Sequence, residues 1–284
     1  MIVLGIGLCF KREFTMEKDE ELKTQEQEVV VVENVEKPKK KRKGPYQCFF
    51  KRFFDILFSF LAIVILSPVY IIIYLLSLII LRGNPIFKQY RFGKNQKVFA
   101  VYKFRSMTNK KDKDGNLLPD KDRMTKWGMF LRKLSLDELP QFFNILFGQM
   151  SFIGPRPRMI QECVFLEEDQ KTRFEVIPGI TGWAQVHGRN LIDFNKVVEY
   201  DKYYVEHLNI WMDIKIVFKT IGYVFGKKGI NKEGTVSNEF HGDFLLRTGE
   251  ITKEYYDEKI AIANKMIETA KTKNIKNSDK KDPQ

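Results

Sequence analysis

The longest apolar stretch of the chain runs from Phe53 to Leu81 and contains 29 residues with a single charged side chain, Asp55. A straight helix of that length would measure about 43 Å, more than the roughly 30 Å hydrocarbon core of a bilayer. Pro68 lies almost at its centre and removes a backbone hydrogen bond, which predicts a break at Ser67-Pro68. Each half is then about 22 Å long and too short to cross a membrane alone.

Basic residues flank this stretch on both sides. The segment from Lys37 to Arg52 precedes it, and the cations that follow are Arg82, Lys88, Arg91, Lys94 and Lys97. The positive-inside rule places such flanks in the cytosol. The pattern therefore predicts either a re-entrant membrane helix hairpin over residues 45–82 or a single tilted transmembrane span, and it does not decide between them.

After this apolar stretch, polar and apolar residues alternate or recur at helical spacing. Alternating residues between Asn84 and Met107 predict two strands, and residues 109–123 form a polar loop. Helical spacing follows, and the helices that it predicts cover residues 127–146, 161–174, 194–207 and 252–273. We expect the second of these helices to be charged and exposed, and the last ten residues to be disordered.

Residues 208–229 are apolar around most of the helix circumference. Trp211 and Tyr223 can anchor such a helix at a membrane surface, and the lysines that can reach lipid headgroups are Lys215, Lys219, Lys227 and Lys228. A helix in the protein core would also be apolar. The membrane segment upstream favours an amphipathic interfacial helix.

The net charge of +12 is unevenly distributed. Residues 1–44 begin acidic, are poor in aromatic residues, and predict a disordered, charged N-terminal tether. Residues 37–54 contain eight Lys or Arg residues and no acid. Because this basic block borders a membrane segment and no nucleic-acid-binding module is recognisable, it predicts contact with anionic inner-leaflet lipids and not with nucleic acid. Met16 is an alternative start to Met1.

The stretch R-K-L-S-L-D-E-L-P-Q places two carboxylates, Asp137 and Glu138, side by side among leucines and phenylalanines. Neighbouring residues of a helix point about 100° apart, so the two carboxylates would have different surroundings. Close carboxylates at an apolar boundary are often pushed to different pKa values. An ionised aspartate can act as a covalent nucleophile, although Asp-Glu pairs also occur on ordinary solvated helices.

Two further strings lie downstream. In S-F-I-G-P-R-P-R two prolines bracket Arg156 and fix the backbone around a guanidinium that suits phosphate groups. In I-P-G-I-T-G-W-A-Q-V-H-G-R-N three glycines and a proline surround Trp183 and Arg189. Such a loop is either a plain connector or a close approach of backbone to ligand.

These three strings, in this order and within 60 residues, resemble the bacterial sugar transferase family, the monotopic phosphoglycosyl transferases. The resemblance covers about Lys51 to Gly234. It implies an α/β, mostly helical catalytic domain over residues 83–235 behind the re-entrant helix, with a polar C-terminal extension over 236–284. It also implies a monotopic enzyme on the cytosolic face of the bacterial inner membrane. Such an enzyme transfers a phosphosugar from a UDP-sugar to polyprenyl (undecaprenyl) phosphate, releases UMP, uses Mg²⁺ and serves glycan assembly.

The resemblance also assigns roles residue by residue. Asp137 would attack the donor's β-phosphorus and bind the metal, and Glu138 would be its catalytic partner. The positions that match the family's substrate-binding residues are Lys103, Arg132, Arg156, Arg189 and Asp201. His187 stands where many members have asparagine, which bears on the choice of sugar. Without the resemblance, a single-pass, membrane-anchored basic binding protein without catalysis would remain possible.

Overall fold

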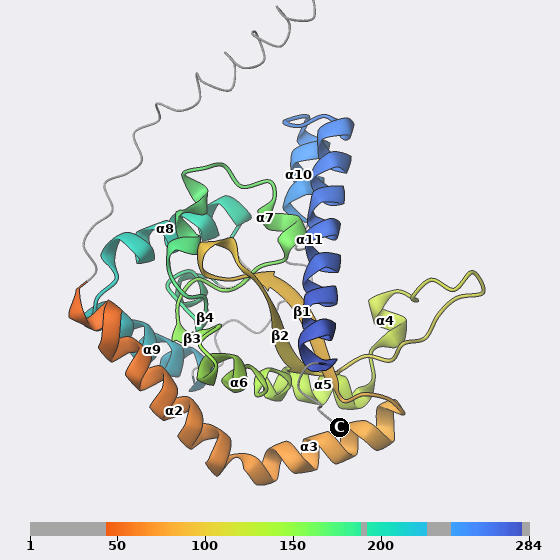
Figure 1. Cartoon of the computed structure of the whole chain (residues 1–284), viewed down its shortest axis with the longest axis horizontal. Coiled ribbons are helices and arrows are strands. Elements are labelled where there is room, and N and C mark those ends of the chain that lie inside the picture. The colour runs from red at the N-terminus through yellow and green to blue at the C-terminus, as the bar shows by residue number, and fades with distance from the viewer. Residues whose placement is uncertain (1–43, 189–191, 226–239, 280–284) are drawn as a thin grey trace, which may run out of the picture. The chain divides into compact units, whose positions relative to one another are not determined.

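A computed structural model describes residues 44–188, 192–225 and 240–279. The expected tether over 1–44 falls outside these ranges except for its last residue, as do Arg189, Lys227 and Lys228. The α-helices, shown in Figure 1, are α2 (Lys51–Ile65), α3 (Ser67–Leu81), α4 (Asp120–Arg123), α5 (Lys126–Lys133), α6 (Gln141–Leu146), α7 (Ile160–Cys163), α8 (Phe194–His207), α9 (Ile210–Phe225), α10 (His241–Thr248) and α11 (Lys253–Asp279). The strands are β1 (Ile86–Phe92), β2 (Val98–Phe104), β3 (Ser151–Ile153) and β4 (Gly179–Thr181). Short π- or 3-10 turns are η2 (Tyr46–Phe50), η3 (Lys94–Gln96), η4 (Leu136–Glu138), η5 (Gln170–Glu175) and η6 (Gln185–His187). The protein is therefore mostly helical with small sheets, as the sequence predicted.

The long apolar stretch forms α2 and α3, which Figure 1 shows as a bent arc along one side of the domain. The helical segment that ends with α2 meets α3 at an angle of 63°. Leu66 leaves the helical conformation at the junction, with φ −88° and ψ 4°, and Pro68 occupies the first turn of α3, where its missing amide hydrogen costs least. Among the described residues, no single helix is long and apolar enough to cross a membrane, whereas this bent pair together has the length and composition to do so.

Both halves of the bent pair are attached to the rest of the protein. At the start of α2, the Lys51 ammonium lies 2.5 Å from the Asp213 carboxylate of α9. One turn further on, buried Asp55 accepts hydrogen bonds from the Ser151 hydroxyl and the Phe152 amide of β3, both at 3.0 Å. In α3, Ser77 accepts a 2.8 Å hydrogen bond from the Trp127 indole of α5.

The two predicted strands pair as an antiparallel hairpin, β1 with β2, with Ile86 opposite Phe104. A second, parallel pair of three-residue strands, β3 and β4, was not predicted. Buried Asn144 of α6 accepts from the Tyr102 amide and donates to the Ala100 carbonyl of β2. This amide fixes α6, and the turn before it, against the hairpin.

The predicted helix over 127–146 is wrong as a single element. Ser135 adopts a left-handed conformation with φ 56°, and Pro140 has no amide hydrogen to donate, so the segment divides into α5, η4 and α6. The predicted helix over 161–174 is also wrong, because only the short α7 and η5 form there. The end of that segment is not exposed, since Arg173 and Phe174 are both buried.

Helix α8 has the predicted bounds, and Asp193 caps it by accepting from the Lys196 amide at 2.8 Å. Helix α9 has two faces. Ile216 is fully buried in the core, whereas Trp211 and Phe218 are 75% and 70% exposed. Helix α9 therefore packs one apolar face in the core and exposes another, so the core and the interfacial interpretation of this segment each describe one of its faces.

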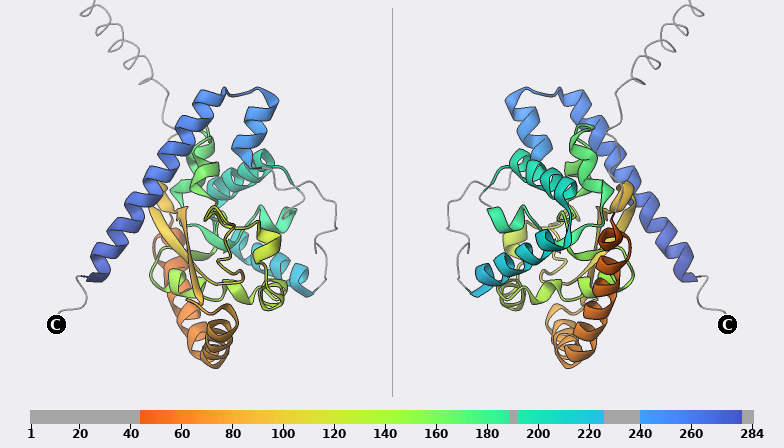
Figure 2. Two further views of the ribbon diagram at one scale, coloured as in Figure 1. Left: turned by 90° about the vertical axis from the view of Figure 1, so that its right-hand side faces the viewer. Right: turned by 90° about the vertical axis from the view of Figure 1, so that its left-hand side faces the viewer.

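The chain after residue 240 is helical and packs on the domain. Helix α11 was predicted over 252–273 and continues to Asp279, so the expected disorder is wrong for residues 275–279. Helix α10 was not predicted. Figure 2 shows α11 as a long rod beside the hairpin and α10 next to it. Fully buried Ala263 of α11 joins a core cluster with Phe92 and Phe174.

Candidate active site

The Asp137–Glu138 pair lies on the 3-10 turn η4, between α5 and α6. Helix α5 begins where Thr125 accepts a hydrogen bond from the Gly128 amide at 2.9 Å. Gly128 contacts the backbone of Ser106, just after β2, so closely that a Cβ atom would lie 1.8 Å from the Ser106 carbonyl oxygen. This close approach, which only glycine allows, places the turn beside the end of the hairpin.

Glu138 is held by two cations. The Lys103 ammonium of β2 lies 3.3 Å from Oε1, and the Arg156 guanidinium bonds the same carboxylate through both of its Nη atoms. Arg156 Nη1 also donates to the Ile180 carbonyl of β4 at 3.3 Å. Burial alone would raise the pKa of Glu138, but the charges of Arg156 and Lys103 outweigh it and bring the pKa to about 2. Glu138 is therefore ionised and fully engaged.

Asp137 has different surroundings, although it is the next residue. Its side chain is 9% exposed, and no side chain in the described parts of the chain donates a hydrogen bond to it. Burial, and then the charge of Glu138, raise the pKa of Asp137, while Lys103 and Arg132 oppose the rise. The Arg132 guanidinium is fixed by a 2.9 Å hydrogen bond from Nε to the Ser106 hydroxyl. Asp137 thus has a carboxylate that no described side chain engages, and it lies between the negative charge of Glu138 and the positive charges of Lys103 and Arg132.

A buried ion pair contacts the backbone of Arg156. Arg173 of η5 lies 2.9 Å from Asp201 of α8, and both side chains are almost fully buried. Arg173 also donates to the Arg156 carbonyl at 2.7 Å. Burial raises the pKa of Asp201 to about 6, although the charges of Arg173 and Arg158 oppose the rise. Asp201 therefore reaches the dyad only through Arg173 and the backbone of Arg156.

The Gly-rich string surrounds a stack of rings next to α9. His187 lies 3.9 Å from the Trp183 ring, and its Nδ1 is 2.7 Å from the Trp183 carbonyl, which fixes Nδ1 as the donor. The other ring nitrogen then accepts from the Lys219 ammonium at 2.7 Å. Lys215 and Lys219 both lie over the Trp183 ring, at 5.3 Å and 4.9 Å. The described part of this string is thus a packed, cationic edge of the domain.

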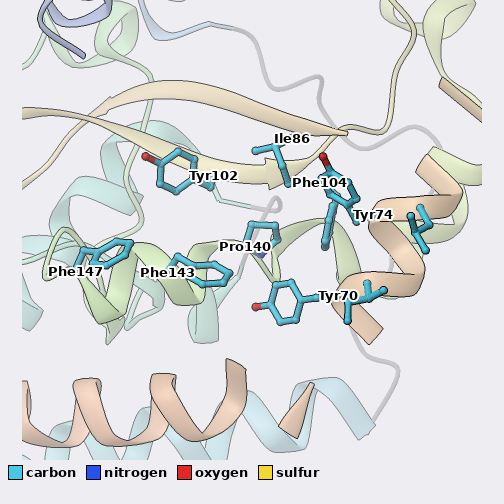
Figure 3. A pocket seen from close by; sticks show the side chains of 10 residues that line it. Tyr70, Tyr74, Ile86, Tyr102, Phe104, Pro140, Phe143 and Phe147 are labelled. Atoms are coloured by element: carbon cyan, nitrogen blue, oxygen red, sulfur yellow. The ribbon is translucent and has the colours of Figure 1, made fainter. Parts of the chain in front are cut away.

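An apolar cavity of about 490 Å³ lies between α3, the hairpin and α6. Figure 3 shows its lining, to which α3 contributes Tyr70 and Tyr74, α6 contributes Phe143, and Phe147 follows directly after α6. Pro140, two residues after Glu138, also lines it. The Tyr70 hydroxyl donates to the Leu139 carbonyl at 2.5 Å, which ties α3 to the turn that carries the dyad.

Among the described residues, no group of three or more His, Cys, Asp or Glu side chains could hold a metal ion alone. A single carboxylate is nevertheless compatible with Mg²⁺, which keeps several waters and is commonly held by one or two carboxylates together with substrate phosphates. Asp137 is the unengaged carboxylate of the dyad, while both Glu138 oxygens bind cations. The residues present therefore fit Mg²⁺ only in this shared mode, with Asp137 as the protein ligand.

The structure brings together most of the residues that the sequence singled out. Lys103, Arg132 and Arg156 surround Asp137 and Glu138, whereas Asp201 lies one layer behind and Arg189 is outside the described residues. Their roles in binding stay predictions. Arg173 and Ser106 were missed, because a lone arginine in a charged stretch and a serine after a strand carry no local signal.

Comparison with known proteins places these features in a family. The chain is 43% identical over 191 residues to the uncharacterized sugar transferase EpsL of Bacillus subtilis, which covers 66% of this chain and 94% of EpsL. It is 42% identical over 182 residues to the UDP-glucose:undecaprenyl-phosphate glucose-1-phosphate transferase of Klebsiella pneumoniae, and that match covers 61% of this chain and 39% of the relative. A third relative is the UDP-N-acetylgalactosamine-undecaprenyl-phosphate N-acetylgalactosaminephosphotransferase of Aeromonas hydrophila, at 41% over 189 residues, covering 63% of this chain and 44% of the relative.

The chain thus spans nearly all of EpsL but about two fifths of the two longer relatives. The model of the bacterial sugar transferase family matches residues 46–227, which include the bent helix pair, the dyad and all three strings. This chain therefore belongs to the bacterial sugar transferase family.

Proposed function

We propose that this chain transfers a phosphosugar from a UDP-sugar to polyprenyl (undecaprenyl) phosphate and releases UMP, as the first membrane step in assembling a surface glycan or a glycoprotein glycan. The observation that carries the proposal is the unequal dyad, in which Glu138 is engaged by two cations while Asp137 is not. The relatives named for sugar-phosphate transfer to undecaprenyl phosphate support the same reaction class.

In the first step an Asp137 oxygen attacks the β-phosphorus of the donor. A bond forms between this oxygen and phosphorus, the bond from phosphorus to the bridging oxygen breaks, and UMP leaves with the electron pair. Two anionic reactants repel each other, so catalysis depends on neutralising the phosphates. Lys103, Arg132 and Arg156 supply three cations around the dyad for this purpose.

In the second step an oxygen of polyprenyl phosphate attacks the same phosphorus. The bond from phosphorus to Asp137 breaks, which restores the carboxylate and leaves a sugar linked to the polyprenyl chain through a diphosphate. The apolar cavity beside Pro140 suits the isoprenoid part of this acceptor, because its wall is almost entirely carbon. The acceptor phosphate would then lie close to the dyad.

We include Mg²⁺ as a cofactor of this reaction, with Asp137 as its protein ligand. When bound, it supplies positive charge that neutralises the donor's diphosphate. The contribution of the chain is to leave one carboxylate unengaged for this ion and to occupy the neighbouring carboxylate of Glu138 with Arg156 and Lys103.

We further propose that the bent helix pair is re-entrant, with both ends on the cytosolic face. Three contacts support this topology. Arg52 of α2 donates to the Ile145 and Leu146 carbonyls of α6, and Ile73 of α3 packs in a core cluster with Leu131 of α5. A straight span would separate its ends by about the 30 Å of the hydrocarbon core and would break one set of these contacts.

Anionic lipids are the surface that we propose for α9. Its exposed apolar side chains include Trp211 and Phe218, and Lys215 and Lys219 follow one edge of that apolar face. No carboxylate in the described part of the chain pairs with either lysine. Lysines at the border of an apolar face lie at the level of lipid headgroups when the face enters the bilayer.

The covalent step predicts that UMP release begins without acceptor. The donor for this test is the UDP-sugar that gives the most UMP when several UDP-sugars are compared with acceptor present. Labelled UMP should then exchange into this UDP-sugar in the absence of polyprenyl phosphate. Asp137→Asn should abolish both exchange and turnover, because an amide of the same shape is a poor nucleophile. Asp120→Asn, at an exposed site on α4, is the matched control. An active Asp137→Asn variant with acceptor-dependent UMP release would exclude the covalent scheme.

The two-pronged contact of Arg156 predicts a geometric requirement. Arg156→Lys keeps the charge but loses the fork, so the donor KM should rise by about tenfold or more. Arg123→Lys, in the ion pair of α4 with Asp120, should leave the donor KM unchanged. Steady-state kinetics of wild type and both variants test this. If the donor KM of Arg156→Lys equals that of wild type, Arg156 has only a structural role.

The topology predicts that thiols at both ends of the bent pair are shielded from outside the cell. A membrane-impermeant maleimide should leave Cys48 and a cysteine introduced as Lys88→Cys unmodified in intact cells, and should label both after the cells are opened. Pro68→Leu should favour a span, because it allows a continuous helix of about 43 Å. Labelling of one site alone in the wild-type background would contradict the re-entrant topology.

The lipid contact predicts a response to headgroup charge. Replacing phosphatidylglycerol by phosphatidylcholine in nanodiscs should lower wild-type activity, and the Lys215→Gln/Lys219→Gln double variant should respond less. Each lysine near an anionic surface is worth about 1 kcal/mol. Lys253→Gln/Lys271→Gln on α11 is a control of equal charge. If all three proteins respond equally, the edge of α9 does not bind lipid.

A further inference from the structure

The C-terminal helices α10 and α11 begin after residue 227, where the match to the family ends. They are nevertheless integrated into the domain. A Cβ atom on Gly242 of α10 would lie 2.4 Å from the Phe165 ring, so this helix approaches the domain as closely as glycine permits. Tyr256 of α11 stacks on the same ring and donates a 2.6 Å hydrogen bond to Asp243. The two helices are thereby fixed to the domain and to each other.

One residue of α10 leads directly towards the active site. His241 is 5% exposed, and its ring stacks on Phe194 of α8 with centroids 4.0 Å apart. The same Phe194 ring carries the Arg158 guanidinium at 4.8 Å. Arg158 is the last residue of P-R-P-R, and only Pro157 separates it from Arg156, which holds Glu138. His241, Phe194 and Arg158 therefore connect the C-terminal extension to the proposed phosphate-binding loop.

Arg158 lies among charges of both signs: burial lowers its pKa and Arg173 adds to this, whereas the charges of Glu162 and Asp201 oppose it. Among the described residues its ion-pair partner is Glu162, at 3.6 Å, which is a loose ion pair. Arg91 lies close enough that burial, together with the charges of Arg156 and Arg158, lowers the pKa of Arg91 to about 10 in spite of Glu162. Arginines that repel one another keep a defined position only when each has a fixed partner. For Arg158 the partners are the Glu162 carboxylate and the Phe194 ring.

The loop transmits this position to Arg156. Proline fixes φ and has no amide hydrogen, so Pro157 allows little independent rotation between the two arginines. Arg156 is held at its carbonyl by Arg173 and at its guanidinium by Glu138. On its C-terminal side the backbone is held by the antiparallel bridge between Met159 and Arg91, and the Arg158 side chain by its own contacts. A small displacement of a residue that positions a substrate can cost up to about a hundredfold in rate.

We propose that the C-terminal helix pair is a positioning element of the active site, in which His241 holds Phe194 and thereby fixes Arg158 and the P-R-P segment that presents Arg156 to the donor's phosphates. His241 is a positioning residue and does not touch the substrate. The inference rests on the proposed function for the identity of the ligand. It adds that residues outside the shared family region contribute to donor binding.

The test is the affinity of the purified full chain for UDP, which carries both donor phosphates, in the presence of Mg²⁺. His241→Ser removes the stacked ring and should weaken UDP binding by about tenfold. His241→Phe keeps a ring of similar size and should bind UDP within about twofold of wild type. The control is Ile267→Ala on α11. Ile267 packs against the same core cluster as Phe194, so this variant should have a lower melting temperature but an unchanged affinity for UDP.

Two results would overturn the proposal: unchanged UDP affinity in His241→Ser, or a loss in Ile267→Ala as large as in His241→Ser. The second would mean that affinity follows stability. If wild type itself neither binds UDP nor releases UMP from any UDP-sugar, the proposed function fails instead, and the two failures are distinguishable.

Cys163 reports whether the helix pair stays in place. It is 2% exposed in the core cluster that contains Ala263, so it should resist a maleimide in every variant that keeps α11 docked. Exposed Cys48 is the internal labelling control. If Cys163 reacts with maleimide in His241→Ser, the helix pair has moved and a second variant, Phe194→Leu, is the test. Leucine preserves apolar packing but provides no ring for Arg158. Weaker UDP binding by about tenfold in Phe194→Leu supports the proposal, and wild-type affinity overturns it.

Discussion

The Glu138 carboxylate is the interaction on which the rest of the site depends. It binds Lys103 of the hairpin and Arg156 of the loop after β3, and Arg156 also donates to the Ile180 carbonyl of β4. Two cations this close would repel each other, and the charge between them offsets that repulsion. Two segments far apart in sequence thus bring their cations to one negative charge, and β4 holds one of these cations in place. The arrangement keeps the cations at the dyad before any phosphate is bound, which is what preorganised electrostatic catalysis requires.

Elements with strong local signals were predictable from the sequence, and those shaped by single backbone conformations were not. Helix α8 has its predicted bounds because Asp193 caps it and its apolar spacing is regular. The hairpin follows from alternation. The break after α5 depends on the left-handed conformation of Ser135, which no periodicity indicates. The parallel pair β3–β4 has three residues in each strand and lies between prolines and glycines, so it has too few positions to show a pattern.

The same limit applies to the site. The motif resemblance gave the dyad and the cations next to it, since these residues stand within short strings. It could not give Ser106 as the partner of Arg132, or Arg173 as the link from Asp201 to Arg156, because each contact joins residues far apart in sequence. The polar average of residues 236–284 likewise hid two specific packing residues, Gly242 and Ala263, whose lack of bulk is what allows close contact. The average composition of a segment does not show which single residues allow its helices to pack on the domain.

The two carboxylates of the dyad are adjacent in sequence and still differ in what they can do. Glu138 accepts bonds from two cations, so its lone pairs are occupied and its pKa falls to about 2, which makes it a poor nucleophile and a poor base. Asp137 is buried, no side chain within residues 44–188, 192–225 and 240–279 donates to it, and its pKa is raised, so its charge is the less stabilised of the two. A less stabilised carboxylate is the more reactive one once cations bring an electrophile to it. These differences support the proposed role of Asp137 as the nucleophile on physical grounds that are independent of the motif. They also support the proposal that Glu138 holds the cations that such a reaction requires.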